Sequence, residues 1–248
     1  MAWTSYTGSP YNFDLFAQRY VNTSAILQPL AAPFVWVPFV LNNGVYQAQL
    51  QVSWAPVLGL SISNYEVYVD GAGAPTAIVI SNQWTMTAAN GLTTNNTHAF
   101  RVDYVMMDGR RSPISPSTSG TTWAGYSWGG IPYEWMAAFY GGYINGKYFT
   151  NNWPLASTAI GGMTLSQIFL SGGNPFDADT WLQTTLLKTP QGFFLNWNTQ
   201  PGATYQVQTT TNLRSWTNLG DPRFAAGTTD SIFVGAGTVG YYRVLLLH

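Results

Sequence analysis

Few residues in this chain have side chains that could carry acid–base or nucleophilic chemistry. The 248 residues include two histidines, His98 and His248, two glutamates, Glu66 and Glu134, and no cysteine. A Ser–His–Asp arrangement needs a histidine, and we expect His98 to be a structural residue. Glycoside hydrolysis needs two carboxylates across a cleft. Glu66 is predicted on a strand and Glu134 on a short helix, and nothing in the spacing pairs them.

Motifs for cofactor or metal chemistry are also missing. The sequence has no glycine-rich phosphate loop and no His-Glu-x-x-His motif, so we predict that the chain is not an enzyme and uses no cofactor. Asp177 and Asp179 are weak candidates for a metal site. They lie in the run Asn174-Pro175-Phe176-Asp177-Ala178-Asp179, and Asn-Pro and Asp favour turns on their own. We therefore expect a turn here, with weak cation binding as the alternative.

Aromatic residues are the remaining candidates for binding. Eleven of them lie between Trp123 and Trp153, more than two short helices need. Three interpretations stay open: a core between domains, a platform on which sugar rings stack, or an interface between subunits. The candidate contact residues of this segment are Trp128, Tyr133, Trp135, Tyr143 and Trp153.

The first thirty residues form a second aromatic segment, and no partner strand is predicted for them. A segment of this kind either lies along a neighbouring subunit, where it adds a strand to an open sheet edge, or folds back on its own domain. Both possibilities stay open. The candidate contact residues are Trp3, Tyr6, Phe13 and Phe16.

The composition excludes several classes of protein. Only 8% of the residues are charged and the net charge is −1, so a nucleic-acid partner is excluded. The aromatic content of 16% excludes a disordered chain. The longest apolar run, from Ala31 to Leu41, has eleven residues and two prolines, which is too short for the roughly 20 residues of a membrane span.

The low carboxylate content suggests where the protein works. Carboxylates paired in the native state lose their interactions when acid protonates them, so a chain with few of them suits an acidic or otherwise harsh extracellular habitat. A neutral surface built for a solid assembly is the competing explanation. Both predict that stability changes little between about pH 2 and 7. No export signal is visible in the sequence, so we expect that one was removed or that another route is used.

Two stretches of the chain share one pattern of alternating apolar and polar residues. The distance from Trp54 to Arg101 is 47 residues, and the distance from Trp197 to Arg243 is 46 residues. Alternation is typical of half-buried strands, and repetition indicates tandem domains. The first copy contains Leu50-Gln51-Val52-Ser53-Trp54, Tyr65-Glu66-Val67-Tyr68 and Phe100-Arg101-Val102, and the second contains Phe194-Leu195-Asn196-Trp197, Tyr205-Gln206-Val207 and Tyr242-Arg243-Val244.

The first copy resembles a fibronectin type III domain. The resemblance is carried by the motifs of that copy, by Gly91-Leu92-Thr93 and by the Asp108-Gly109 turn with the Ser112–Ser115 segment after it. It implies an antiparallel β-sandwich of the immunoglobulin type. His98 stands where the family usually has a corner tyrosine, whose hydroxyl bonds to an upstream backbone carbonyl. A ring nitrogen could make a similar bond, and we expect that bond to weaken if protonation changes its geometry.

The rest of the chain resembles parts of large surface proteins from Verrucomicrobia-like bacteria. The second copy is similar to their small C-terminal β-sandwich, through Tyr205-Gln206-Val207-Gln208 and Ser215-Trp216-Thr217-Asn218. In the segment before it, the proline at the start and Gly141-Gly142 at the end predict a short helix from Pro132 to Tyr140, and the capping-box pattern Thr164-Leu165-Ser166-Gln167 predicts a second helix from Thr164. This segment is similar to the calcium-binding linker of the same proteins. The positions where that family carries aspartate hold neutral residues, so we expect no strong calcium site. These positions are Gly125, Ser127, Gly129, Ser157, Ala159 and Gly161.

The predicted fold is all-β, with tandem immunoglobulin/fibronectin type III-like sandwiches joined by a short two-helix linker. The expected parts are an N-terminal extension (1–32) that contacts or donates a strand to another subunit, a first sandwich (33–123), an aromatic-rich linker (124–179) and a small C-terminal sandwich (180–248). The predicted function is that of a non-enzymatic extracellular or cell-surface structural protein, a homo-oligomer or polymer that forms a filament or layer. The alternative is a carbohydrate-binding or adhesion module, possibly an accessory part of a larger secreted protein.

Overall fold

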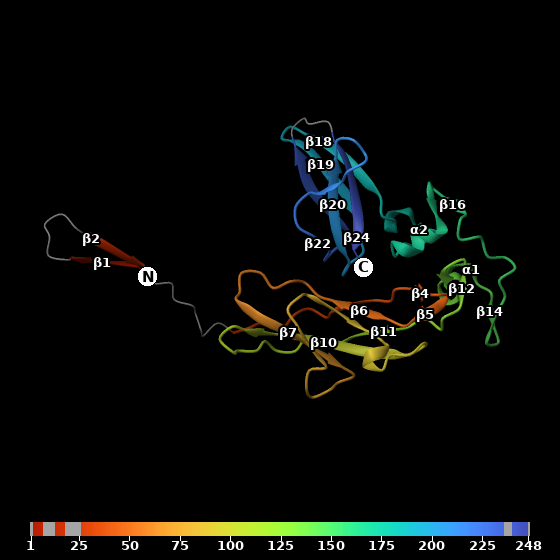
Figure 1. Ribbon diagram of the computed structural model, residues 1–248, viewed down its shortest axis with the longest axis horizontal. Coiled ribbons are helices and arrows are strands. Elements are labelled where there is room, and N and C mark those ends of the chain that lie inside the picture. The colour runs from red at the N-terminus through yellow and green to blue at the C-terminus, as the bar shows by residue number, and fades with distance from the viewer. Residues whose placement is uncertain (1, 7–12, 18–25, 236–239, 248) are drawn as a thin grey trace.

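The computed structural model describes residues 2–6, 13–17, 26–235 and 240–247, and of the first two ranges it describes the strand pairing. Two antiparallel β-sandwiches are joined by a segment that holds the two α-helices of the described chain (Figure 1). This arrangement confirms the predicted fold class of tandem sandwiches with a two-helix linker.

The first sandwich pairs a three-stranded sheet with a four-stranded sheet. In spatial order, the smaller sheet contains β3 (Phe34–Trp36), β6 (Leu50–Ser53) and β9 (Gln83–Met86), and the larger contains β11 (Thr118–Thr121), β10 (Thr97–Met106), β7 (Ile62–Val69) and β8 (Ala77–Val79). All neighbouring strands are antiparallel. Counted along the chain without the short ribbon after β3, the first, second and fifth of these seven strands form one sheet and the other four form the second sheet. This is the strand order of a fibronectin type III domain.

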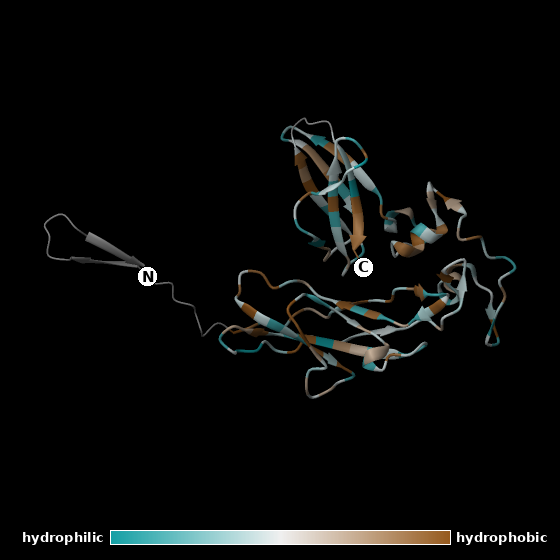
Figure 2. Cartoon of the chain, in the orientation of Figure 1, coloured by the Kyte–Doolittle hydropathy of each residue, from teal (hydrophilic) through white to brown (hydrophobic). Residues whose placement is uncertain are grey.

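Alternation along these strands fills the space between the sheets. Leu50 and Val52 on β6 and Phe100 and Val102 on β10 are fully buried, because every second side chain points inward. Figure 2 shows the alternation as bands along the strands. Trp54 follows β6 and is also buried. Truncating a buried aromatic residue of this size to alanine costs about 3–5 kcal/mol, so the sandwich depends on this side chain.

The linker contains three small ribbons and two helices. The ribbons are β12 (Ser127–Trp128) with β13 (Ile131–Pro132), β14 (Tyr143–Ile144) with β15 (Lys147–Tyr148), and β16 (Ala159–Ile160) with β17 (Met163–Thr164), and the helices are α1 (Tyr133–Tyr140) and α2 (Leu165–Leu170). α2 starts at a capping box in which the Gln167 N–H donates to Thr164 Oγ1 (3.2 Å) and the Thr164 N–H donates to Gln167 Oε1 (2.8 Å). Both predicted helices are therefore present.

The C-terminal sandwich repeats the first with fewer strands. One sheet contains β18 (Thr184–Thr189), β19 (Gly192–Asn198) and β23 (Thr229–Gly235). The other contains β24 (Tyr241–Leu247), β20 (Thr204–Thr210) and two short strands that both pair with β20, namely β21 (Thr217–Asn218) and β22 (Arg223–Phe224). The two sandwiches also share a tyrosine hydrogen bond at an equivalent position. The Tyr65 hydroxyl accepts the Val57 N–H (3.1 Å), and the Tyr205 hydroxyl accepts the Gln200 N–H (2.8 Å).

Two further ribbons and two short 3-10 helices complete the described chain. The ribbons are β1 (Ala2–Tyr6) with β2 (Phe13–Ala17) and β4 (Val40–Asn42) with β5 (Val45–Gln47), and the 3-10 helices are Ala88–Asn90 and Ala178–Thr180. Each ribbon is a sheet of its own. No helix in the described ranges is long and apolar enough to cross a membrane.

Candidate functional site

Two carboxylates come together on the outer face of the larger sheet in the first sandwich. Glu66 on β7 and Asp103 on β10 are direct cross-strand partners, and they are 3% and 2% exposed. The Tyr68 hydroxyl lies 2.9 Å from Glu66 Oε2 and 3.1 Å from Asp103 Oδ2. Arg111 also donates to Glu66 Oε2. The sequence did not indicate this pair, because only the register of β7 against β10 brings the two residues together.

The electrostatics of this cluster differ from those of a catalytic pair in a cleft. Burial, reinforced by the neighbouring Glu66 charge, raises the pKa of Asp103 above its ordinary value. Burial and the two carboxylates raise the pKa of Tyr68 as well. Both carboxylates are covered by protein, so no substrate reaches them in this arrangement. The cluster can hold charge and a proton on the covered outer face of this sheet, which is a structural role.

His98 makes a different bond from the one expected. Its Nδ1 lies 2.7 Å from Oδ2 of Asp70, in the turn after β7. Burial alone would raise the pKa of Asp70, but hydrogen bonds from the Ala99 N–H and from His98 outweigh it and lower that pKa. The expected effect of protonation on the bond of His98 stays a prediction. His248 lies outside the described residues.

Most of the linker's candidate binding residues pack against one another. Trp153 is buried, and its ring meets Tyr133 edge-on at 5.2 Å between centroids and Trp128 at 6.3 Å. Trp135 contacts Phe169 of α2 at 5.5 Å. These four candidates, Trp128, Tyr133, Trp135 and Trp153, belong to one apolar cluster of the linker, against which Phe39 of the first sandwich also packs.

The other candidates fall into three groups. Tyr143 is largely exposed and leans on Tyr148 at 4.6 Å. Asp177 accepts the Asp179 N–H at its Oδ1 (3.1 Å) and caps a 3-10 helix, and within the described ranges no group of three or more His, Cys, Asp or Glu residues could hold a metal ion. The N-terminal candidates Trp3, Tyr6, Phe13 and Phe16 lie on β1 and β2, and their side chains are outside the described residues.

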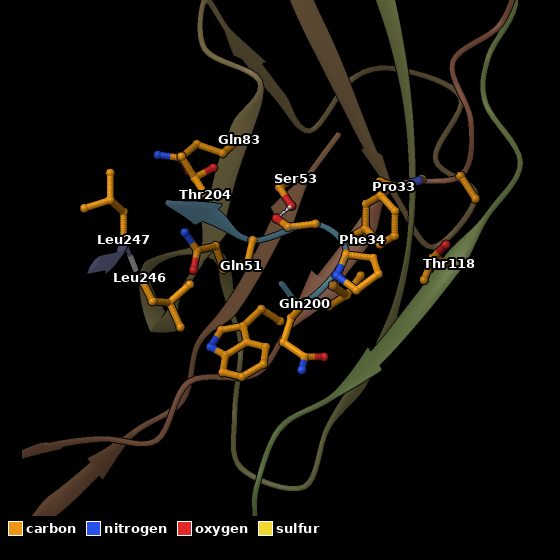
Figure 3. A pocket seen from close by; sticks show the side chains of 16 residues that line it. Pro33, Phe34, Gln51, Ser53, Gln83, Thr118, Gln200, Thr204, Leu246 and Leu247 are labelled. Atoms are coloured by element: carbon orange, nitrogen blue, oxygen red, sulfur yellow. Dashed lines mark hydrogen bonds between the residues drawn. The ribbon is translucent and has the colours of Figure 1, made fainter. Parts of the chain in front are cut away.

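A cleft lies between the two sandwiches. It has a volume of about 360 Å³, and Figure 3 shows that both sandwiches contribute to its lining, with Phe34, Gln51 and Gln83 from the first and Gln200 and Leu246 from the second. The described lining residues carry no charge. It is lined by Ala32, Pro33, Phe34, Val35, Trp36, Gln51, Ser53, Gln83, Thr118, Gln200, Pro201, Gly202, Ala203, Thr204, Leu246 and Leu247.

Two contacts hold the walls of this cleft together. The Ser53 hydroxyl donates to the Gly202 carbonyl (2.6 Å), as the dashed line in Figure 3 shows. Gly202 has φ +87° and lies so close to Phe34 that a Cβ at this position would overlap the phenyl ring. The glycine therefore permits both the turn and the close approach. The cleft can take a neutral molecule that offers hydrogen-bonding groups to amides and a face to an aromatic ring.

The C-terminal sandwich is closed on one side and open on the other. On the closed side, Arg223 of β22 forms an ion pair with Asp230 of β23 (2.6 Å) and ties the two sheets together. At the opposite ends of these sheets lie β18 and β24, each with one neighbour among the described strands. We call the space between them the open side.

Leu186 marks the open side. It pairs with Leu195, which points into the core, so Leu186 faces the interior as well. Yet it is 54% exposed. An inward-facing leucine with this exposure shows that nothing in the described chain covers the core at this position. The alternating motifs predicted β19, β20 and β24, but they did not indicate which sheet edges lack a neighbour.

Comparisons with known proteins found matches among solved structures only. No family model and no curated protein matches the chain. Among solved structures, the sixth fibronectin type III domain of a human fibronectin type III domain containing protein 3 is 17% identical and has a TM-score of 0.31 (40% of this chain and 88% of that chain).

Two other matches have similar values. FN3tt is 22% identical with a TM-score of 0.29 (40% and 100% of the two chains). A beta-1,2-glucanase from Parabacteroides distasonis is 18% identical with a TM-score of 0.28, and the match covers 40% of this chain but only 14% of the enzyme. The assignment of a fibronectin type III-like fold to the first sandwich rests on its own strand order and register.

Proposed function

We propose that this chain is a non-enzymatic structural protein of the cell surface or extracellular space, and that its copies associate edge to edge into a filament or layer. The open side of the C-terminal sandwich is the observation that carries the proposal. Sheet edges expose unpaired N–H and C=O groups that pair readily with another strand. Here such edges flank an uncovered part of the core.

The residues around the open side favour association. Soluble proteins usually protect sheet edges with charged residues, proline or bulges. β18 is exposed from Thr184 to Lys188, and Lys188 is its only charged residue. Leu187 on its outer face is 54% exposed, the same fraction as Leu186. With a net charge of −1, repulsion between copies is small.

The resemblance of the linker and C-terminal sandwich to bacterial surface proteins supports the proposed location. Their calcium ligands are replaced by neutral residues in this chain, so the linker would take its rigidity from its aromatic core instead. This part of the proposal has its own test. If it is correct, adding EDTA leaves the thermal unfolding temperature unchanged.

Self-association can be tested on the purified full chain by sedimentation velocity and negative-stain electron microscopy over a hundredfold range of concentration. We expect concentration-dependent polymers with a regular repeat. The Leu186→Lys variant places a charge on the open side and should reduce the polymer fraction at least tenfold. A wild-type chain that stays monomeric across the range would refute the proposal.

The cleft between the sandwiches supports a second candidate function, the binding of a neutral carbohydrate. Sugars combine hydroxyl groups with apolar ring faces, and the cleft offers Phe34 together with the amides of Gln51, Gln83 and Gln200. Calorimetric titration with soluble neutral oligosaccharides tests this. Binding that is lost in Gln51→Ala and kept in Gln47→Ala, on the β4–β5 ribbon outside the cleft, would support it, and no heat with any glycan would refute it.

A further inference from the structure

The first sandwich shows what normally fills the position that is open in the second. Its last strand, β11, pairs with β10 and packs across the interface onto the first strand, β3. The contact is tight, since a Cβ at Gly120 of β11 would overlap Val35 of β3. In this copy the first strand of one sheet is thus covered by the last strand of the other.

Register identifies the equivalent residues in the second copy. Val35 pairs with Val52, two residues before Trp54, and Leu186 pairs with Leu195, two residues before Trp197. Leu186 is therefore the counterpart of Val35. Val35 is half-buried beneath β11, whereas Leu186 is mostly exposed. The difference locates the missing cover at the position of a strand equivalent to β11.

The other wall of the open side gives the same result. Phe100, Val102 and Tyr104, the inward residues of β10, are all buried. Their counterparts on β24 are Tyr242, Val244 and Leu246, and each is only half-buried. A strand placed beside β24 would cover these residues from one side and Leu186 from the other.

The residues around the open side determine what such a strand needs. It needs alternating apolar residues on the inward face, because that face meets Leu186 and the half-buried residues of β24. On the outward face it would lie next to Arg243, the charged residue of β24. A negatively charged outward residue would complement this charge, and an unpaired positive one would oppose it.

The N-terminal extension meets these requirements. The sequence of β2 is Phe13-Asp14-Leu15-Phe16-Ala17, so Phe13, Leu15 and Ala17 share one face and Asp14 lies on the other. Asp14 is the only charged residue among the first eighteen. In the described chain β2 pairs only with β1, and the first sandwich has all seven strands without it.

We propose that β2 of a second copy of this chain inserts as the missing strand beside β24, with Phe13, Leu15 and Ala17 facing inward and Asp14 next to Arg243. This rests on the proposed function, and it names the contact that joins the copies. The segment from residue 18 to β3 has sixteen residues, which at about 3.3 Å per residue reaches roughly 50 Å, enough to cross to a neighbouring molecule.

The first test is cross-linking, because a chain without cysteine gives no background disulfides. Full-length Asp14→Cys is mixed with full-length Arg243→Cys, Tyr241→Cys or Leu245→Cys and oxidised. We expect a disulfide-linked dimer for at least one of these outward-facing β24 positions. Thr229→Cys, exposed on β23 at the far edge of the other sheet, is the control and should give none. Two results would refute the contact: a dimer with Thr229→Cys, or the absence of a dimer with all three β24 positions.

The second test separates this inference from the proposed function. Full-length Leu15→Asp should lose polymerisation but keep an open side, and should bind a labelled peptide of residues 11–19 with saturable fluorescence anisotropy. Binding should weaken at least tenfold when the peptide itself carries Leu15→Asp, and also when the full-length acceptor carries Leu186→Lys in addition. Leu187→Lys in the acceptor, equally exposed but on the other face, should leave binding unchanged.

Each outcome has one meaning. If wild-type chains polymerise and Leu15→Asp chains polymerise equally, the proposed function stands and the inserted strand is wrong. If the wild-type chain stays monomeric but the peptide binds as described, the groove accepts this strand and the polymer is wrong. A chain carrying both Asp14→Cys and Arg243→Cys that closes a disulfide within one monomer would show that the strand comes from its own chain, which refutes the proposed exchange.

Discussion

At the scale of single residues, charge is concentrated in a few contacts of specific geometry. Glu66 and Asp103 are like charges placed directly opposite each other, an arrangement that destabilises a sheet unless a proton or a cation compensates. Tyr68 and Arg111 supply hydrogen bonds and charge at Glu66, and Asp103 Oδ1 has no hydrogen-bond partner among the described residues. The residues could be found in the sequence, but their pairing could not, because 37 positions separate them and only the register joins them.

Asp103→Asn tests this interpretation. Burial raises the pKa of Asp103, so the folded state holds the proton more tightly than the unfolded state does. The stability that this protonated carboxyl contributes is complete below the pKa of Asp103 in the unfolded state, and it is lost as the pH rises through the pKa in the folded state. Relative to wild type, the variant should therefore gain stability between about pH 4 and 7, as measured by urea unfolding. Asp221→Asn, on an exposed turn, is the control, and an equal gain there would contradict the prediction.

At the scale of elements, alternation and the spacing of the tryptophans from the arginines predicted both sandwiches, and the Thr164–Gln167 pattern predicted the start of α2. These features are local, so one sequence is enough to show them. The strand missing beside β24 was not predicted, since periodicity identifies strands but not their neighbours. The aromatic run of the linker was visible, but only the packing of Trp153 against Trp128 and Tyr133 showed that it builds a core.

The two copies offer a matched pair of valines for testing the open side. Val102 is fully buried on β10, whereas its counterpart Val244 on β24 is half-buried. We expect Val102→Ala to lower the unfolding free energy of its domain by about 2–3 kcal/mol and Val244→Ala to lower it by about 1 kcal/mol. Denaturant unfolding should be followed at concentrations where the chain is monomeric. Equal losses would show that the interior of β24 is already covered.

At the scale of the whole molecule, the sandwiches meet at Gly202, and this contact sets their arrangement. Gly202→Ala would introduce a side chain at a positive φ and against Phe34, which together cost about 2–4 kcal/mol. We expect the domains to separate, with a larger radius of gyration in small-angle scattering and a lower unfolding temperature. Gly227→Ala, which meets nothing within 4 Å, should leave both unchanged. An unchanged radius in Gly202→Ala would contradict the prediction.

Acid stability also belongs to the whole molecule, and the ion pairs modify the expectation of a flat profile. Burial acts to raise the pKa of Asp230, but hydrogen bonds from Arg223 and from the Ser231 N–H outweigh it and lower that pKa. The resulting stability is present above the unfolded pKa and is lost as pH falls through the folded pKa. Urea unfolding should show a decline below about pH 4 that is smaller in Asp230→Asn. A decline of the same size in both proteins would exclude this pair as its cause.

The open side beside β24 also has a consequence for the ends of an assembly. When two different surfaces of the protein bind each other, the growing assembly always keeps one free surface of each kind. Copies therefore continue to add unless the assembly closes into a ring. Such a fibre has direction: one terminal copy keeps an empty groove and the other keeps an unused strand. A short soluble peptide with the sequence of the strand would then block growth only at the end with the empty groove. Because each fibre has one such end, the number of bound peptides would equal the number of fibres.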